Sequence, residues 1–125
     1  SGPNVLGVEA LQGDDGCTGV KVNTADGYAD YLFTATDMQA HHPSKRVSFC
    51  GRLGLIREKE GQIQLMYLGC GRSLKKGNFV LESDHDVYAA IYMQHGVWYY
   101  SATGPVRVKI GKETKKLNEG YNQKL

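Results

Sequence analysis

The stretch FCGRLGLIREKEGQIQLMYLGCGRSLKKGNFVL, residues 49–81, decides the fold class of this chain. A period of two places alternate side chains on one face of a β-sheet. Glycines recur between the apolar runs, where the missing Cβ permits the positive φ of a tight turn. The stretch therefore predicts consecutive β-strands with no helix between them. The alternating apolar residues are Phe49, Leu53 and Leu55, then Ile63, Leu65 and Tyr67, then Phe79 and Leu81.

The same pattern extends over the rest of the chain. Turn residues such as those at 13–16 separate about ten short runs, and no window has the period of a helix. Short strands at roughly 8–12-residue spacing are typical of an antiparallel sandwich. We expect an all-β, jelly-roll-like antiparallel β-sandwich in a single domain over residues 1–111. A basic, flexible C-terminal tail is expected over residues 112–125.

The alternation also predicts the core. Each expected core residue lies on the apolar side of an expected strand, where burial stabilises the fold. The expected core residues are Phe49, Leu53, Leu55, Ile63, Leu65, Phe79, Leu81, Ile91, Val106 and Val108.

Composition and charge exclude several classes of protein. The formal net charge of +2 is too small to imply nucleic-acid binding, and no apolar run approaches the roughly 20 residues that span a bilayer. The three cysteines show no CxxC spacing, which argues against a disulfide framework or a structural zinc site. We expect a monomer that binds neither nucleic acid nor membrane, and the start at Ser1-Gly2-Pro3 suggests a piece of a larger protein.

No set of residues predicts an active site. His41 and His42 are adjacent, so in an extended segment their side chains point in opposite directions and cannot easily bind one metal ion. His85 lies between two aspartates in a segment that reads as an ordinary polar turn. The sequence contains no nucleophile elbow, HExxH, P-loop or dinucleotide fingerprint. We therefore expect no catalytic residues, no cofactor and no metal in this chain.

The aromatic residues are candidates for ligand binding. Aromatic rings stack on the apolar faces of sugar rings at little cost in side-chain entropy. The candidates are Tyr88, Tyr92, Trp98 and Tyr100. A two-residue turn at His95-Gly96 would place Trp98 and Tyr100 in the core, on the face opposite Tyr88, Tyr92 and Tyr99. A three-residue turn would bring all four onto one face, and the sequence leaves both open.

Basic residues alternate out of two expected strands. Arg52 and Arg57 point out of the long strand, and Arg107 and Lys109 point out of the last one. Cations beside tyrosines suit an acidic sugar polymer, because they pair with carboxylate or sulfate groups while the rings stack. The alternative is that these cations are solvated residues that protect the edge of a sheet.

Four short motifs carry a resemblance to a known family. They are Tyr31-Leu32-Phe33, the run FCGRLGLIR at 49–57, LGCGRSL at 68–74 and GNFVLE at 77–82. Together they resemble the C-terminal β-sandwich region of heparinase II/III-like polysaccharide lyases. No residue here matches the catalytic tyrosine and histidine of those enzymes.

The resemblance implies a non-catalytic carbohydrate-binding module for an acidic polysaccharide, uronate-containing or sulfated. The module would be attached to a parent catalytic domain and would be secreted or periplasmic. One alternative is a purely structural domain that packs against its parent lyase without binding glycan. Another is a small stand-alone enzyme.

Overall fold

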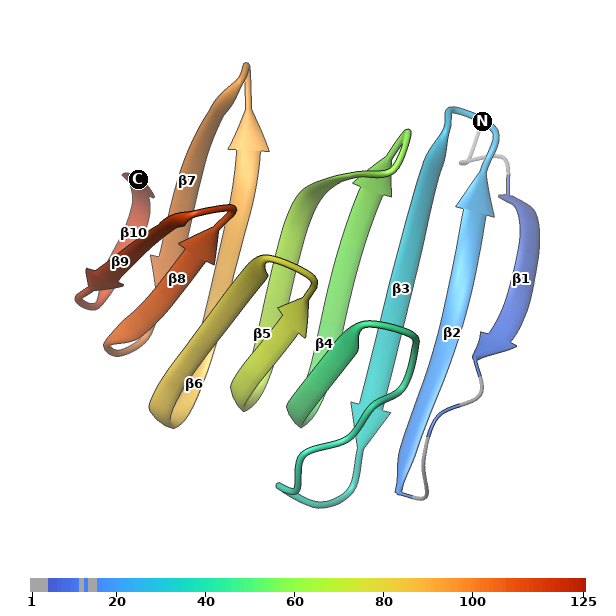
Figure 1. Cartoon of the computed structure of the whole chain (residues 1–125), viewed down its shortest axis with the longest axis horizontal. Helices are drawn as coiled ribbons and strands as arrows, with labels where there is room; N and C mark the ends of the chain where they lie inside the picture. Colours follow the sequence, from blue (N-terminus) through green and yellow to red (C-terminus); the bar gives the residue numbers. More distant parts are fainter. Residues whose placement is uncertain (1–4, 12, 14–15) are drawn as a thin grey trace.

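The chain forms ten β-strands and no helix over the residues that the computed structural model describes, which are 5–11, 13 and 16–125. All strand pairs are antiparallel (Figure 1). None of the described segments is a helix that could span a membrane. The strands are β1 (Val5–Leu11), β2 (Cys17–Thr24), β3 (Tyr28–Ala35), β4 (Val47–Lys59), β5 (Gln62–Lys76), β6 (Phe79–Gln94), β7 (Val97–Ala102), β8 (Val106–Ile110), β9 (Glu113–Leu117) and β10 (Gly120–Lys124).

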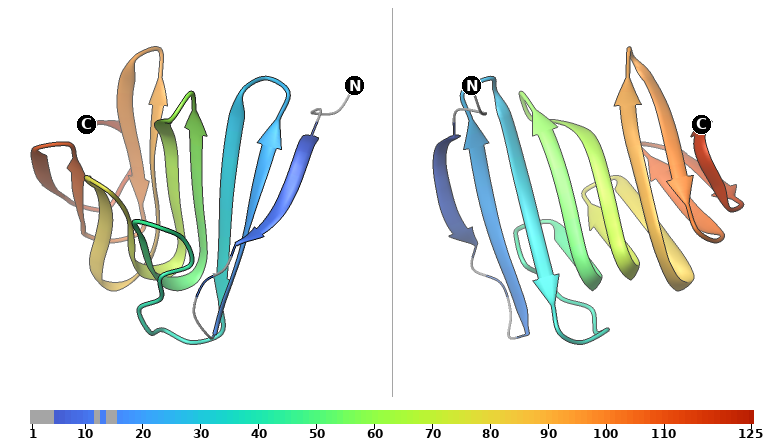
Figure 2. Two further views of the ribbon diagram at one scale, coloured as in Figure 1. Left: turned by 45° about the vertical axis from the view of Figure 1, so that its right-hand side comes forward. Right: turned by 180° about the vertical axis from the view of Figure 1, so that it is seen from behind.

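The strands belong to one sheet that folds over on itself. The main path runs β1-β2-β3-β4-β5-β6-β7-β10, while β8 pairs with β6 and β9 pairs with β8. Strands β4, β5 and β6 are 13, 15 and 16 residues long, and each bends in its middle (Figures 1 and 2). The sheet is not closed, and its pairing does not show a jelly roll of two separate sheets. The expectation of an all-β antiparallel domain is confirmed.

The bends divide the sheet into two layers. The large layer contains β1, β2, β3, β7, β10 and residues 51–59, 62–71 and 87–94 of the bent strands. The small layer contains β8, β9 and residues 47–50, 73–76 and 79–82 of the same bent strands. The outer face is defined here as the side of the large layer that points away from the small layer.

Two paired glycines lie at the bend. Gly51 of β4 is directly opposite Gly71 of β5, beside shifts in the register of the two strands. A Cβ atom on Gly71 would lie 2.5 Å from Cδ1 of Leu68 and 2.8 Å from the carbonyl oxygen of Cys50. Such distances are shorter than van der Waals contact, so only glycine permits this close approach of the strands.

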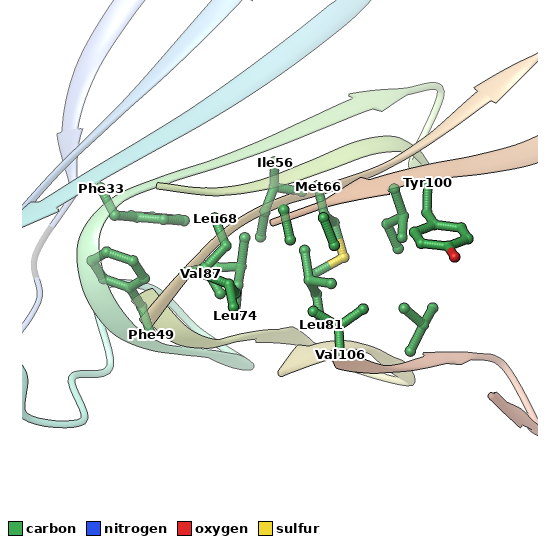
Figure 3. Packing of buried hydrophobic residues seen from close by; sticks show 14 of the residues in the cluster. Phe33, Phe49, Ile56, Met66, Leu68, Leu74, Leu81, Val87, Tyr100 and Val106 are labelled. Atoms are coloured by element: carbon green, nitrogen blue, oxygen red, sulfur yellow. The ribbon is translucent and has the colours of Figure 1, made fainter. Parts of the chain in front are cut away.

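The hydrophobic core fills the space between the two layers (Figure 3). Most of its side chains are fully buried, so packing of one layer on the other supplies the apolar burial that stabilises the fold. A half-buried ion pair between Glu58 and Lys76, 2.6 Å long, joins the layers at one side of the core. The largest buried side chains are Phe33, Phe49, Ile56, Met66, Leu68, Leu74, Leu81 and Ile91.

Six of the expected core residues are buried, and Phe79 is partly buried against the core. The six are Phe49, Ile63, Leu81, Ile91, Val106 and Val108. The prediction was wrong for Leu53, Leu55 and Leu65. Leu53 is 37% exposed, and the other two are half-buried on the outer face.

Irregularities in the strands explain these three errors. The register of β4 and β5 shifts between Cys50 and Gly51 and again between Arg57 and Glu58, and Cys70 has a φ of 50°. Both shifts place one extra residue in β5, Arg72 at the first and Gln64 at the second, and such irregularities change which side chains point inward. Ile56 and Met66 are therefore fully buried in place of Leu55 and Leu65.

The segment expected to be a tail contains two strands. Residues 113–117 pair with β8, and residues 120–124 pair with β7. These strands are short and mostly exposed, so their side chains show little of the apolar alternation that marks a strand in the sequence. Backbone hydrogen bonds to β7 and β8 hold them in the sheet, which corrects the expectation of a segment without regular structure.

Candidate functional site: a tyrosine-rich outer face

The outer face of the large layer is open along its whole width. The right-hand view in Figure 2 looks onto this face, and no described segment of the chain crosses strands β1–β7 there. Side chains directly opposite each other on antiparallel strands lie on the same face and touch. The pairing register therefore gives the rows of side chains that this face presents.

One row carries two stacked tyrosines. Tyr92 of β6 is directly opposite Tyr99 of β7, with ring centroids 6.0 Å apart and an interplanar angle of 18°. Lys124 of β10 is opposite Tyr99 on the other side and extends the row. The Tyr92 hydroxyl donates a hydrogen bond to the Asn122 side chain, which fixes the first ring against β10. The row thus ends in a flat aromatic pair next to a cation.

The neighbouring row forms a shallow groove of about 210 Å³. Its floor contains the small residues Ala90 and Ser101, which are directly opposite each other on β6 and β7. Tyr67, Tyr88 and Tyr121 also line it. Tyr88 is 54% exposed and Tyr121 is 79% exposed, so their rings are available to a ligand. The small residues form the floor of the groove, and the tyrosine rings form its walls.

A cluster of cations lies farther along the outer face. Arg57 of β4 is 4.8 Å from the centroid of the Tyr28 ring, and the Lys59 ammonium is 5.0 Å from it. Arg57 also makes two hydrogen bonds to Asp30, of 2.7 and 2.9 Å. The hydrogen bond to Asp30 raises the pKa of Arg57 above its ordinary value. Among the described residues, no acidic side chain pairs with Lys59 or Lys124, whose charges remain available for an anion.

Three of the residues predicted from the sequence lie on this face. Tyr88, Tyr92 and Arg57 all point outward from the large layer. They do not form one compact contact, because Leu65 lies between Arg57 and Tyr92 in the same row.

Trp98 and Tyr100 lie on the opposite, inner face. The hairpin has the two-residue turn, with Met93 opposite Trp98 and with φ values of 52° for His95 and 77° for Gly96. Trp98 packs against Phe79 at a centroid distance of 6.0 Å. Tyr100 is 8% exposed and donates a hydrogen bond of 3.1 Å to the Asn118 carbonyl. Both rings therefore contribute to packing between the layers and are separated from Tyr88 and Tyr92.

The remaining predicted cations lie away from the tyrosines. Arg107 and Lys109 are on β8 in the small layer, where Arg107 is 3.2 Å from Glu82 and 3.1 Å from Asp84. These hydrogen bonds, first the one to Asp84, raise the pKa of Arg107. Arg52 donates a hydrogen bond to the Thr36 carbonyl beside the bend. The eight predicted residues thus divide among separate surfaces.

Four tyrosines of the outer face are not among the eight predicted site residues. They are Tyr28, Tyr67, Tyr99 and Tyr121. The two-residue turn places Tyr99 beside Tyr92, so the sequence predicts this pair only when that turn is chosen. Tyr67 needed the bulge in β5, because unbroken alternation assigns it to the side of Ile63. Tyr121 lies in the segment expected to be a tail and had no strand to orient it.

The described residues do not gather metal ligands elsewhere. No group of three or more His, Cys, Asp or Glu residues could hold a metal ion in the part of the chain that the structure describes. His41 is 5% exposed, and its Nε2 is 2.6 Å from Asp37. The His41 backbone pairs with Phe49, so this histidine anchors the loop between β3 and β4. None of the three cysteines forms a disulfide with another described residue.

Comparison with known proteins identifies the family. Residues 5–93 match the family model described as "Endo-acting ulvan lyase C-terminal domain". No curated protein and no solved structure gave a match. The expectation of an accessory domain of a polysaccharide lyase is confirmed, whereas the resemblance to heparinase II/III-like enzymes is not. The match covers most of the chain and both halves of β4 and β5, so the chain belongs to the family of endo-acting ulvan lyase C-terminal domains.

Proposed function

We propose that this domain is a non-catalytic module that binds an acidic polysaccharide on the tyrosine-rich half of its outer face. The tyrosine-rich half is defined by Tyr67, Tyr88, Tyr92, Tyr99, Tyr121 and Lys124. The observation that carries the proposal is the exposure of Tyr88 and Tyr121 around a groove with a small-residue floor. The family name supplies the polymer, since an ulvan lyase acts on ulvan.

The groove suits a sugar chain for two physical reasons. Pyranose rings have apolar faces that stack on tyrosine, and a wide aromatic surface holds successive sugars without distorting them. Lys124 beside Tyr99 offers a cation to a carboxylate or sulfate group on the same chain. A groove on an open face also accepts an internal stretch of polymer, which agrees with the endo-acting description of the family.

The proposal places no chemical step in this domain. The parent lyase would supply catalysis, and the module would raise the local concentration of polymer beside it. A secreted or periplasmic location is part of the proposal, because the enzyme must meet a polymer outside the cytoplasm.

Binding is tested by isothermal titration of the 125-residue chain with ulvan at low and high salt. We expect Tyr88→Ala combined with Tyr121→Ala to weaken binding at least tenfold, about 1.4 kcal/mol. Both rings are largely exposed, so the variant should unfold at nearly the same urea concentration as the original chain. Higher salt should weaken binding only in part, because ion contacts are screened while stacking survives.

Lys109→Ala is the matched control, since it removes a cation from the small layer and should leave affinity unchanged. Absence of binding to ulvan at low salt would make the domain structural. Binding that survives the double tyrosine variant but is lost in Lys109→Ala would assign the site to the small layer instead.

A further inference from the structure

The other half of the outer face carries aliphatic side chains beside the Arg57–Asp30 pair and Lys59. Val8 of β1 is opposite Val22 of β2, and Val20, Leu32 and Leu55 follow one another across β2, β3 and β4. Leu53 lies in the next row. The aliphatic half is defined by Val8, Val20, Val22, Leu32, Leu53 and Leu55.

Several apolar side chains on this side of the sheet are exposed to solvent. Val8 is 65% exposed and Leu53 is 37% exposed, and Leu6 of the same edge strand is 72% exposed. The inner face of β3 and β4 is already apolar, since Phe33 and Ile56 are fully buried there. Strands that are apolar on both faces are typical of sheets covered on both sides, and contiguous exposed patches mark interaction sites.

We propose that the aliphatic half docks onto the lyase region that precedes β1 in the parent enzyme. The family consists of C-terminal domains, so the lyase polypeptide enters this domain through β1. β1 is the edge strand of the sheet and carries Leu6 and Val8, the most exposed members of the apolar surface on this side. The attachment point and the apolar surface therefore coincide.

The tether favours the lyase over a second copy of this chain. A covalently linked partner is present at an effective concentration on the order of millimolar, so a patch of modest area is sufficient. A second copy must associate from dilute solution, which requires roughly 800 Å² of buried surface on each partner for a stable interface. Branched aliphatic side chains also lack the flat faces that stack on sugars, which separates this half from the tyrosines.

Docking through this half leaves the tyrosines accessible. β1 is at one end of the sheet path and β7 and β10 are at the other (Figures 1 and 2). A lyase seated over β1–β4 would therefore lie beside the groove and leave it open to polymer. The two halves of one face would hold the enzyme and its substrate next to each other.

Hydroxyl-radical footprinting tests the docking without any substitution. The intact lyase and the 125-residue chain are oxidised in the absence of polysaccharide, and the rates at Leu6, Val8 and Leu53 are compared by mass spectrometry. We expect these rates to fall at least fivefold in the intact lyase, whereas Tyr88 and Tyr121 react equally in both proteins. Equal rates at Leu6, Val8 and Leu53 in the two proteins would overturn the proposal.

A charged variant supplies the second arm. Val8→Asp combined with Leu53→Asp in the intact lyase should return the rate at Leu6 to its value in the isolated chain. Tyr121→Asp, at a more exposed position on the other half, should leave Leu6 protected. Protection of Leu6 that persists in the double variant would overturn the proposal. So would protection that appears in the isolated chain as its concentration rises, since a second copy would then cover the face.

Discussion

Replacing Gly71 by alanine should destabilise the domain through the bend that separates the two layers. The added Cβ would lie 2.5 Å from Cδ1 of Leu68, 2.8 Å from the Cys50 oxygen and 2.9 Å from Cα of Gly51. Carbon atoms pack best at about 3.5–4.0 Å, so the first contact is too short by about 1 Å. Leu68 is fully buried and cannot turn away freely, and the other two contacts are to backbone.

The size of the loss follows from these contacts. Overpacking a well-filled core costs about 1–3 kcal/mol, and here strands β4 and β5 would also have to separate. Alanine is favoured over glycine within a strand by about 0.5–1 kcal/mol, which offsets part of the cost. We expect a net loss of about 1–2 kcal/mol in the free energy of unfolding, against the roughly 5–15 kcal/mol typical of a domain.

Urea denaturation followed by tryptophan fluorescence measures this loss. Trp98 is the only tryptophan, and it packs against Phe79 across the two layers, so its emission reports their separation. Gly7→Ala is the matched control, because no atom of the described residues, apart from the adjacent ones in the chain, lies within 4 Å of the position of its Cβ. The two variants are compared by their free energies of unfolding. If the value for Gly71→Ala were less than about 0.5 kcal/mol below the value for Gly7→Ala, the bend would not depend on glycine at position 71.

Two further predictions concern the inward residues and the loop before β4. Ile56→Ala should lower the free energy of unfolding by about 2–5 kcal/mol, because Ile56 is fully buried. Leu55→Ala should lower it clearly less in the same urea assay, because Leu55 is half-buried. A larger loss for Leu55→Ala would mean that Leu55, and not Ile56, points into the core. A hydrogen bond from His41 lowers the pKa of Asp37 below its ordinary value of 3.8, so its contribution to stability is complete above pH 3.8 and is lost as the pH falls through the lower folded-state pKa. In Asp37→Asn, the urea concentration at the midpoint of unfolding should depend less on pH below pH 3.8. If the midpoint fell with pH as steeply as in the original chain, other carboxyl groups would cause the fall.

Local patterns in the sequence predicted most of the strands and most of the turns. The alternation around Ile63 and the turn residues at 60–61 gave the β4–β5 hairpin, and the runs near Ile91 and Val106 gave the second half of β6 and β8. The polar turn expected around His85 was wrong, because this segment lies within β6. These features depend on neighbouring residues only, so a sequence contains enough information to place them. The single bent sheet depends on which strands continue through a glycine-rich segment, and turn residues do not distinguish a bend from a chain reversal.

The candidate site was less predictable because it depends on side-chain direction over long strands. The irregular pairing of β4 with β5 near residues 50–51 and 70–72 interrupts the simple alternation, and Leu53 and Leu55 beyond it lie outward. The pairing of Tyr92 with Tyr99 depended on a choice between two turn lengths that the sequence left open. The groove also needs Tyr121, whose strand is held by hydrogen bonds to β7 rather than by apolar alternation of its own.

The three strands that run through both layers join them by covalent bonds. Separate sheets can slide over each other as their side chains repack, whereas a slide here would have to stretch the backbone at the bends in β4, β5 and β6. Tension on the outer face, as from a tethered polymer under flow, would therefore pass into the small layer along peptide bonds. The small layer would therefore share the force, because it contains the continuations of the same strands.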